Sequence, residues 1–520
     1  MRVLRAILVW VLILGIVPLG PWPEGINPAS MAWARGGDGG GGDGGDGGSD
    51  GGSDGGSDSG SDSDGAGDDG GSSSSSDGSS SSSSSDQDSS EAGGVGGGEA
   101  KGREFRRSLR TIFGRPSPEP APRAARARTP APRPAPRPTE APREIIARGL
   151  NEADAAALVA QGYGVIDRID LATLGVNIQR LSVPRGTTLA EARAAVQALP
   201  TGETADFNHY YRAEAADLPQ ATEDAAPLAP CDGLHCAARA LIHWPEHIGA
   251  QTCGAPVTIG MIDTGINTTH AALAAAQVAL TRVAPEDYSA SGAIHGTAVA
   301  AILVGDAGSR TPGLLPGVPL VAVDAFHKAS GDERADVYTL VQGLDQLIGA
   351  GATVINLSLS GPPNTVLEDT LAAIEAAETA VVVAAAGNGG PNAPPAYPAA
   401  YDSVIAVTAV DRSGGIYRRA GRGPHVDLAA PGVEVWTAAS VEGARWKTGT
   451  SFAAPYVTAA AALWRQANPE MTPAQIRDAL TQSAADLGAP GPDEVYGHGL
   501  LDLHGRCPEP GAALLLPAAE

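Results

Sequence analysis

Four polar residues stand where buried-looking segments begin or end, and their types together suit one reaction. Asp263 ends the apolar run "VTIGMID", His295 opens "HGTAVAAILVG", Asn388 follows "AVVVAAAG", and Ser451 opens "SFAAPYVTAAAALW". A serine hydroxyl is a weak nucleophile, so it needs a base, the base needs a carboxylate that orients it, and the oxyanion needs donors. The four residues supply each role once and predict acyl transfer from a carbonyl.

The surroundings of Ser451 allow two interpretations. The stretch "KTGTSFAAPYVTAAAALW" is a run of small apolar residues typical of a tightly packed helix, and it opens at Gly449-Thr450-Ser451. A serine there could simply cap the helix, because its oxygen accepts a backbone N–H of the first turn. Alternatively, the donor-rich N-terminus of the helix could hold an oxyanion beside a nucleophilic hydroxyl. The other three residues favour the second interpretation.

Alternating strands and helices from about Gly254 onward predict a doubly wound α/β domain with a mostly parallel sheet. Most of the strands are apolar throughout, as expected of parallel strands covered on both faces. Sheets of this kind place functional groups at the carboxyl ends of their strands. The predicted strands are 257–263, 318–326, 353–360, 380–387 and 404–410, and the predicted helices are 295–305, 335–351 and 364–379.

The segments "IDTGIN", "HGTAVA", "AAAGNGG" and "GTSFAAP" resemble, in this order, the catalytic motifs of the subtilisin-like serine proteases. The resemblance covers about Val257 to Leu503 and implies a serine endopeptidase that hydrolyses peptide bonds in proteins or peptides. It implies a triad of Asp263, His295 and Ser451, with Asn388 as the oxyanion donor. We therefore expect a peptidase domain over residues 231–507, followed by a tail over 508–520.

The segment "INLSLSGP" resembles the family's substrate-cleft strand. An extended substrate should lie along Ser358, Leu359 and Ser360 as an added strand. The family often has glycine where Ser360 stands, so the added side chain should narrow the primary pocket. Gly389, next to the oxyanion donor, adds no charge. A neutral side chain before the scissile bond is therefore predicted.

A smaller module is predicted before the peptidase domain, over residues 144–212. Its pattern of strand 144–149, helix 151–162, strands 163–170 and 176–184, helix 188–199 and strand 205–212 suggests a ferredoxin-like α+β fold. It resembles the family's inhibitory prodomain, whose last strand often carries a pattern like "FNHYYR". We expect a polar linker at 213–230 and self-cleavage between Tyr211 and Pro230. The alternative is a permanent accessory domain.

The region before residue 144 is predicted to have no core. Residues 1–34 show the charged, apolar, small-residue order of a signal peptide, and no other stretch is long enough to span a bilayer. Residues 35–100 form a disordered Gly/Asp/Ser-rich tract, and residues 101–143 an Arg/Pro/Ala-rich linker. The net charge of −24 argues against nucleic-acid binding. We expect a secreted or periplasmic monomer, with attachment to the cell surface as an alternative.

The cysteines and the histidines outside the triad are further candidate functional groups. Four cysteines, 231, 236, 253 and 507, predict two disulfides in an exported protein, one of them involving Cys253. His270 lies near Asp263 but resembles a structural histidine. The segment "HWPEH" fits a zinc motif, but Pro245 interrupts the helix that the motif needs. No cofactor or metal site is predicted; calcium is common in the family, yet no ligands can be matched.

Three other functions compete with proteolysis. A catalytically inactive subtilase-like binding protein is disfavoured because all catalytic residue types are present. An esterase would carry G-x-S-x-G, which is absent around Ser451. A surface adhesin would use the Gly/Asp/Ser tract as a stalk.

Overall fold

The computed structural model describes residues 136–213, 216–217, 233–245, 253, 256–505 and 507–508. The predicted signal peptide, the Gly/Asp/Ser tract, all but the end of the Arg/Pro/Ala-rich linker, most of the 213–230 linker and nearly all of the tail lie outside these residues. Among the described residues, no helix is both long and apolar enough to cross a membrane.

A seven-stranded parallel sheet forms the centre of the peptidase domain, with the order β15-β14-β13-β12-β6-β9-β7. Five of its strands are buried at every position, and for the four of them that were predicted this confirms the expectation drawn from their apolar runs. The strands are β6 (Ile259–Asp263), β7 (Val278–Arg282), β9 (Leu320–Asp324), β12 (Val354–Leu357), β13 (Val381–Ala385), β14 (Ile405–Val410) and β15 (Leu428–Pro431).

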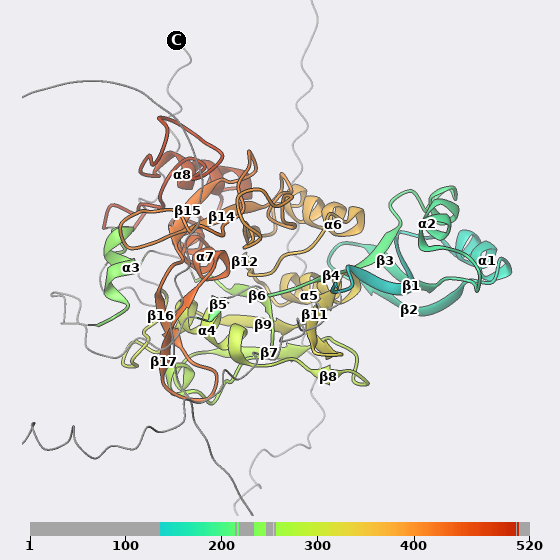
Figure 1. Cartoon of the computed structure of the whole chain (residues 1–520), viewed down its shortest axis with the longest axis horizontal. Helices are drawn as coiled ribbons and strands as arrows, with labels where there is room; N and C mark the ends of the chain where they lie inside the picture. Colours follow the sequence, from blue (N-terminus) through green and yellow to red (C-terminus); the bar gives the residue numbers. More distant parts are fainter. Residues whose placement is uncertain are drawn as a thin grey trace, which may run out of the picture. The chain divides into compact units, whose positions relative to one another are not determined.

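Helices cover both faces of this sheet, as a doubly wound α/β fold requires (Figure 1). One apolar core lies between the sheet and the helices α4 and α7, and a second lies between the opposite face and the helices α5 and α6. The predicted helix 335–351 starts later, because Asp336 caps it and the residues before it form a strand. The helices are α3 (Cys236–Leu241), α4 (Ile294–Val304), α5 (Val337–Gly349), α6 (Thr365–Ala376), α7 (Thr450–Ala467) and α8 (Pro473–Gln482), with a 3-10 turn η1 (Ala271–Leu273).

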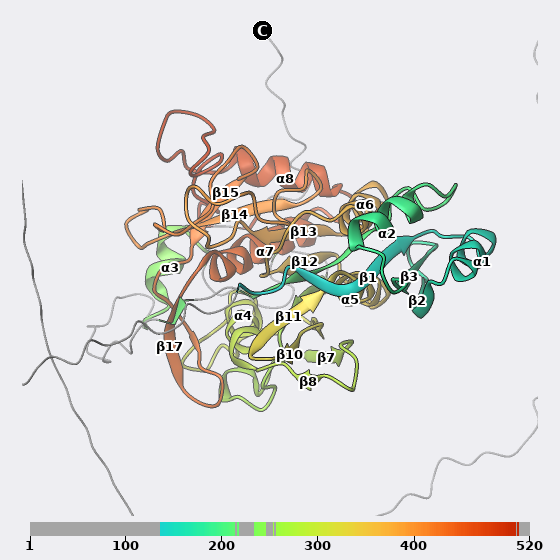
Figure 2. The ribbon, with the colours of Figure 1, turned by 45° about the vertical axis from the view of Figure 1, so that its right-hand side comes forward.

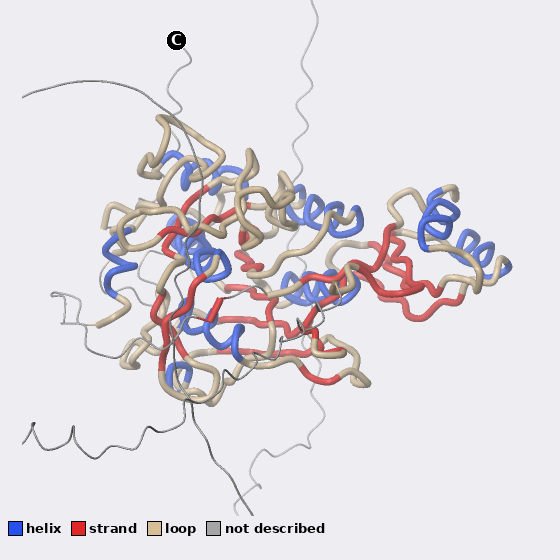
Figure 3. The backbone as a smooth tube through the Cα atoms, viewed as in Figure 1, coloured by secondary structure: helices blue, strands red, loops and turns tan. Residues whose placement is uncertain are grey.

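The module before the peptidase domain has the element order β-α-β-β-α-β, and its antiparallel strands are ordered β2-β3-β1-β4. Figure 3 shows the strands of the module in red with its helices in blue beside them. Alternate residues of β1 enter two different cores. Ile145 and Ala147 pack under the module's own helices, whereas Ile146 joins the core that contains α5 and α6. The elements are β1 (Glu140–Arg148), α1 (Glu152–Ala160), β2 (Gly164–Leu171), β3 (Val176–Ser182), α2 (Leu189–Gln197) and β4 (Asp206–Tyr211).

The remaining strands join the module to the peptidase domain. Strand β4 pairs with β11, which extends the module's sheet through β10 to β8, and β5 pairs with β17 in a separate three-stranded sheet (Figure 2). These are β5 (Ala216–Asp217), β8 (Ser289–Ala290), β10 (His327–Ala329), β11 (Asp332–Asp336), β16 (Val435–Ala438) and β17 (Ala444–Thr448).

Two sequence expectations differ from these elements. The first strand begins at Glu140 rather than Glu144, because a register shift between Glu140 and Ile145 accommodates Pro142, which has no N–H to donate. The segment predicted as an exposed linker contains β5, whose two residues pair with a strand more than 200 residues away. So short a strand leaves no local hydrophobic pattern.

Cys253 and Cys507 form a disulfide that links the start of the peptidase domain to its end. Cys236 is also disulfide-bonded, and none of the described cysteines is free. The prediction of a bridge that involves Cys253 is confirmed, whereas Cys231 lies outside the described residues.

Candidate active site

Asp263 and His295 meet at the carboxyl edge of the parallel sheet. The side chain of Asp263, the last residue of β6, is fully buried, and Nδ1 of His295 lies 2.7 Å from its Oδ1. A carboxylate only accepts hydrogen bonds, so Nδ1 carries the proton and Nε2 of the neutral ring is left as the basic atom. Within the described residues, Nε2 has no hydrogen-bond partner. The imidazole is therefore oriented to take a proton from a neighbour.

The backbone around this pair holds the imidazole against the carboxylate. Oδ1 of Asp263 also accepts the backbone N–H of Thr264 at 2.7 Å, and the hydroxyl of Thr264 accepts the N–H of Gly296 at 3.0 Å. These bonds tie the end of β6 to the first turn of α4, which carries His295. A Cβ at position 296 would collide with the carbonyl oxygen of Thr264, so only glycine permits this approach.

Ser451 is the second residue of α7, and Gly449 is its N-cap. The interpretation of Ser451 as a helix cap is therefore wrong. The ring of the next residue, Phe452, lies 5.3 Å from the imidazole of His295, centroid to centroid, which brings the start of α7 beside the Asp–His pair. Ser451 is buried, and the first N–H groups of a helix have no partner within it. The hydroxyl thus stands in a donor-rich environment.

A buried polar chain fixes the position of Ser451 relative to the sheet. The hydroxyl of Ser358 donates to the carbonyl oxygen of Ser451 at 2.8 Å, and the amide of Asn356 donates to Ser358 at 2.9 Å. The hydroxyl of Thr458, about two helical turns further along α7, lies 3.0 Å from the amide oxygen of Asn356. Sequence reasoning missed Asn356 and Thr458, because neither belongs to a motif that carries the reaction.

Asn388 is held with its amide oxygen toward α7. This oxygen accepts the backbone N–H of Thr450 at 3.0 Å and lies 3.2 Å from the hydroxyl of Thr450, which itself accepts the N–H of Gly387 at 3.1 Å. Gly387 has a positive φ of 90°, which favours glycine and turns the chain sharply after β13. Because its oxygen is occupied by a backbone donor, Asn388 presents its amide N–H groups on the opposite side.

The strand predicted to bind substrate is already paired. Ser360 exchanges two backbone hydrogen bonds with Arg212, of 2.8 and 2.9 Å, in an antiparallel bridge. The side chains of Ser358 and Leu359 are buried, so this segment offers its backbone. Just before Arg212, Tyr210 and Tyr211 pair with Asp336 and Ala335 of β11. The end of the module thus runs as an extended strand between β11 and the predicted substrate strand.

A second buried carboxylate, Asp324, lies beside Asp263 on the neighbouring strand β9. Burial raises its pKa, although it accepts hydrogen bonds from the hydroxyl of Ser291 at 2.8 Å and the N–H of Phe326 at 3.1 Å. Ser291 in turn accepts the N–H of Gly265 at 2.8 Å. These contacts stabilise the turn that follows Asp263, and no sequence motif indicates them.

The histidines outside the triad have structural contacts. His270 accepts the N–H of Ala272 at 3.0 Å and lies 3.0 Å from the carbonyl oxygen of Gly443, so it caps η1. His243 lies 3.0 Å from Asp502. Across the described ranges, no three His, Cys, Asp or Glu side chains are grouped closely enough to hold a metal ion.

Comparisons with known proteins agree with this geometry. Residues 254–499 match the model of the subtilase family. The chain is 35% identical over 253 residues to Subtilisin DY of Bacillus licheniformis, an alignment that covers 48% of this chain and 90% of the relative. It is 32% identical over 259 residues to the minor extracellular protease Epr of Bacillus subtilis (strain 168), covering 48% of this chain and 38% of the relative.

A similar solved structure is that of the prenylagaramide maturation protease PagA, at 27% identity and a TM-score of 0.42, which covers 48% of this chain and 92% of that chain. The sheet, the site and the relatives define a serine-type endopeptidase with a subtilisin-like α/β fold. The chain belongs to the subtilase family.

Proposed function

We propose that the chain is an exported endopeptidase that hydrolyses peptide bonds through an acyl-enzyme on Ser451. The observation that carries this proposal is the 2.7 Å contact between Nδ1 of His295 and Asp263, beside the N-terminus of the helix that carries Ser451. His295 takes the proton of the Ser451 hydroxyl at Nε2 as the oxygen attacks the substrate carbonyl. Asp263 keeps the other ring nitrogen protonated and stabilises the imidazolium that forms.

The oxyanion is stabilised by the Asn388 amide and the backbone N–H of Ser451. The contacts from Thr450 support this role for Asn388, because they hold its oxygen and so direct its N–H groups away from α7. Donors fixed before the reaction need no reorganisation when charge develops, which is why they lower the barrier. His295 then returns its proton to the leaving amine, and water releases the acyl group by the same steps.

The triad is tested with Ser451→Ala and His295→Ala, which should each lower kcat by about 10⁶-fold, a magnitude known from a subtilisin. The variants should keep the wild-type circular dichroism spectrum. Labelling by a fluorophosphonate probe should occur in the wild type and disappear in Ser451→Ala. A variant without the hydroxyl that cleaves peptides at the wild-type rate would remove Ser451 from the mechanism.

We further propose that the module is a prodomain and that the enzyme cuts itself free of it. Arg212 pairs with Ser360 of the predicted substrate strand, and Ala216 pairs with Thr448, three residues before Ser451 in the chain. The segments on either side of residues 214 and 215 thus lie against the predicted substrate strand and the strand that leads to the nucleophile. This register narrows the expected cut to the three bonds that join Ala213 to Ala216.

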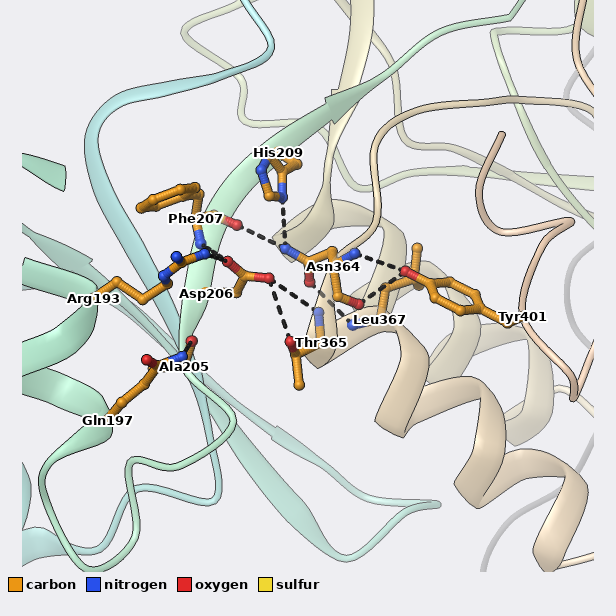
Figure 4. Close-up of polar contacts among 10 residues, drawn as sticks. All are labelled: Arg193, Gln197, Ala205, Asp206, Phe207, His209, Asn364, Thr365, Leu367 and Tyr401. Carbon is orange, nitrogen blue, oxygen red and sulfur yellow. Dashed lines mark hydrogen bonds and ion pairs between the residues drawn. The ribbon is translucent and has the colours of Figure 1, made fainter. Parts of the chain in front are cut away.

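Contacts with the N-termini of α5 and α6 support a role of the module in folding and inhibition, and Figure 4 shows those with α6. Asp206 accepts the first N–H of α6, from Thr365, at 3.1 Å, and Asn208 accepts the N–H of Tyr338 in the first turn of α5 at 3.3 Å. Helix N-termini carry unpaired N–H groups and partial positive charge, so these acceptors stabilise both helices. A doubly wound sheet has many non-local pairings, and a template for two of its helices should speed its folding.

Self-cleavage is tested by expressing the wild type and Ser451→Ala side by side and sequencing the N-terminus of the peptidase fragment. We expect the wild type to begin at residue 214, 215 or 216, and Ser451→Ala to remain one chain. After the cut, the module should co-purify with the enzyme and inhibit it. A fully active wild type with residues 144–212 still covalently attached would exclude the prodomain, and equal cutting of pure Ser451→Ala would exclude self-cleavage.

Export as a monomer completes the proposal. The order of charged, apolar and small residues in 1–34 supports a signal peptide, and one relative is named an extracellular protease. Because Ser451→Ala should keep its module, its N-terminus reports signal removal alone. We expect that N-terminus near residue 35 in protein recovered from the medium or periplasm, with a monomer mass in light scattering. Recovery of unprocessed chain from the cytoplasm alone would contradict export.

A further inference from the structure

The guanidinium of Arg212 binds a carboxylate of the peptidase domain, while the backbone of Arg212 pairs with the predicted substrate-binding strand. Its Nε and Nη2 donate to the two oxygens of Asp332, at 2.9 and 2.6 Å, in a bidentate pair. Both side chains are largely buried, with 15% and 9% of their surfaces exposed. A guanidinium paired in this planar way with a carboxylate gives geometric selectivity as well as attraction.

Asp332 is the first residue of β11, the strand that pairs with the end of the module. Although burial acts in the opposite direction, hydrogen bonds from Arg212 and Arg334 lower the pKa of Asp332, so it is ionised at neutral pH. Arg334 donates a single bond of 3.1 Å to it and stacks 3.8 Å from the ring centroid of Tyr210. Arg137 approaches the same carboxylate at 3.9 Å.

Removal of the module would remove most of the residues that contact Asp332. Arg212, Arg137 and Tyr210 all precede the proposed cut, whereas Asp332 and Arg334 remain with the enzyme. Of the described partners of the Asp332 carboxylate, Arg334 would then remain, and it donates a single hydrogen bond. A carboxylate can accept about four hydrogen bonds, so room remains for a second cation at the place that Arg212 leaves.

We propose that Asp332 is a specificity-determining residue of the mature enzyme, which binds an arginine or lysine side chain at the substrate position that Arg212 occupies. The inference rests on the proposed function, because it treats Arg212 as a substrate residue. The preferred substrate is an extended peptide with a basic residue shortly before the scissile bond. Arginine should be preferred over lysine, because only its guanidinium reproduces the bidentate pair.

The experiment uses enzyme that has processed itself from the full chain and has been separated from its module. Quenched fluorescent peptides with the sequence of residues 205–221 carry Arg, Lys, Gln or Glu at the position of Arg212 and are otherwise identical. We expect kcat/KM to fall about 10-fold from Arg to Gln, as for a partly solvated charged hydrogen bond, and further for Glu. The order should be Arg, Lys, Gln, Glu, with the Arg–Gln difference shrinking in high salt.

Variants of Asp332 assign the preference to this residue. Asp332→Asn, which keeps the shape, should bring the Arg-to-Gln ratio of kcat/KM close to one, and Asp332→Lys should reverse the order of the Arg and Glu peptides. Asp332→Glu is the conservative control and should retain a preference for Arg. Arg334→Gln, which removes the competing cation, should raise the Arg-to-Gln ratio.

The possible results separate the two proposals. Equal cleavage of all four peptides by the wild type, dependent on Ser451, would overturn the subsite and leave the protease intact. An Arg preference that survives in Asp332→Asn would overturn the role of Asp332. If the wild type cleaves none of the peptides, the proposed function itself fails.

Discussion

Replacing Thr450 by valine should impair catalysis without touching any residue that contacts the substrate. Thr450 is fully buried and forms two contacts with the amide oxygen of Asn388, one from its N–H at 3.0 Å and one from its hydroxyl at 3.2 Å. Valine preserves the backbone contact and nearly the same volume, but it removes the hydroxyl. Asn388 then keeps one of these two anchors and can turn more freely.

The expected loss of kcat follows from the number of contacts that hold the amide oxygen of Asn388. Loss of an oxyanion donor lowers kcat about 10²–10³-fold in a subtilisin, equivalent to about 2.7–4 kcal/mol. If one of two anchors provides about half of the positioning, Thr450→Val should cost about 1.4–2 kcal/mol, or about 10- to 30-fold in kcat. The buried N–H of Gly387 also loses its acceptor, which should lower the free energy of unfolding by about 1–3 kcal/mol.

The assay is a steady-state measurement of kcat and KM for Thr450→Val, Thr450→Ser, Asn388→Ala and the combination Thr450→Val with Asn388→Ala. Thr450→Ser retains the hydroxyl and should stay near the wild-type kcat, and KM should change little throughout. In the Asn388→Ala background, Thr450→Val should cost nothing further in kcat. A full additional 10-fold loss in that background would refute the reasoning, because Thr450 would then act independently of Asn388.

Three further outcomes are expected. Asp206→Ala should raise the inhibition constant of the module about 10-fold, because Thr365 loses a charged acceptor at a helix N-terminus, while Asp206→Asn should have a smaller effect. Burial lowers the pKa of His209 in the packed module, so His209 takes up a proton when the module is released at low pH. Inhibition by the module should therefore be strongest above about pH 7 and weaken as the pH falls through 6. His209→Gln should flatten this profile between pH 8 and 5. In the catalytically inactive chain, replacing Cys253 and Cys507 by serine should lower the free energy of unfolding by about 2–4 kcal/mol in denaturant titrations, and an unchanged midpoint would show that the bridge is dispensable.

Much of the central sheet could be predicted from the sequence, and so could the meeting of Asp263 with His295. Strands such as Val381–Ala385 are uniformly apolar because helices cover both faces, so their pattern is visible locally. Reactive residues follow such strands because parallel strands end at one edge of the sheet. The contact between His295 and Asp263 agrees with the roles predicted from the motifs.

The supporting contacts could not be predicted, because they depend on partners distant in sequence. Thr450 looks like an ordinary residue before a nucleophile until the fold places Asn388 beside it. The polar strand "DERAD" has no hydrophobic alternation, and it is a strand because β4 and β10 lie on its two sides. The partner of Cys253 could not be chosen from sequence either, since three pairings of four cysteines are equally open.

The contacts of strand β4 explain why its sequence is unusually polar. Asp206, Asn208 and Tyr210 are buried at alternate positions of a strand, where apolar side chains would normally stand. Two of them face helix N-termini, where unpaired N–H groups make a polar acceptor more favourable than an apolar group. The third covers the guanidinium of Arg334. Inward polar residues in a strand therefore indicate a surface of exposed donors opposite it. In this chain that surface belongs to the peptidase domain, and a module released as proposed would carry these polar residues into solvent.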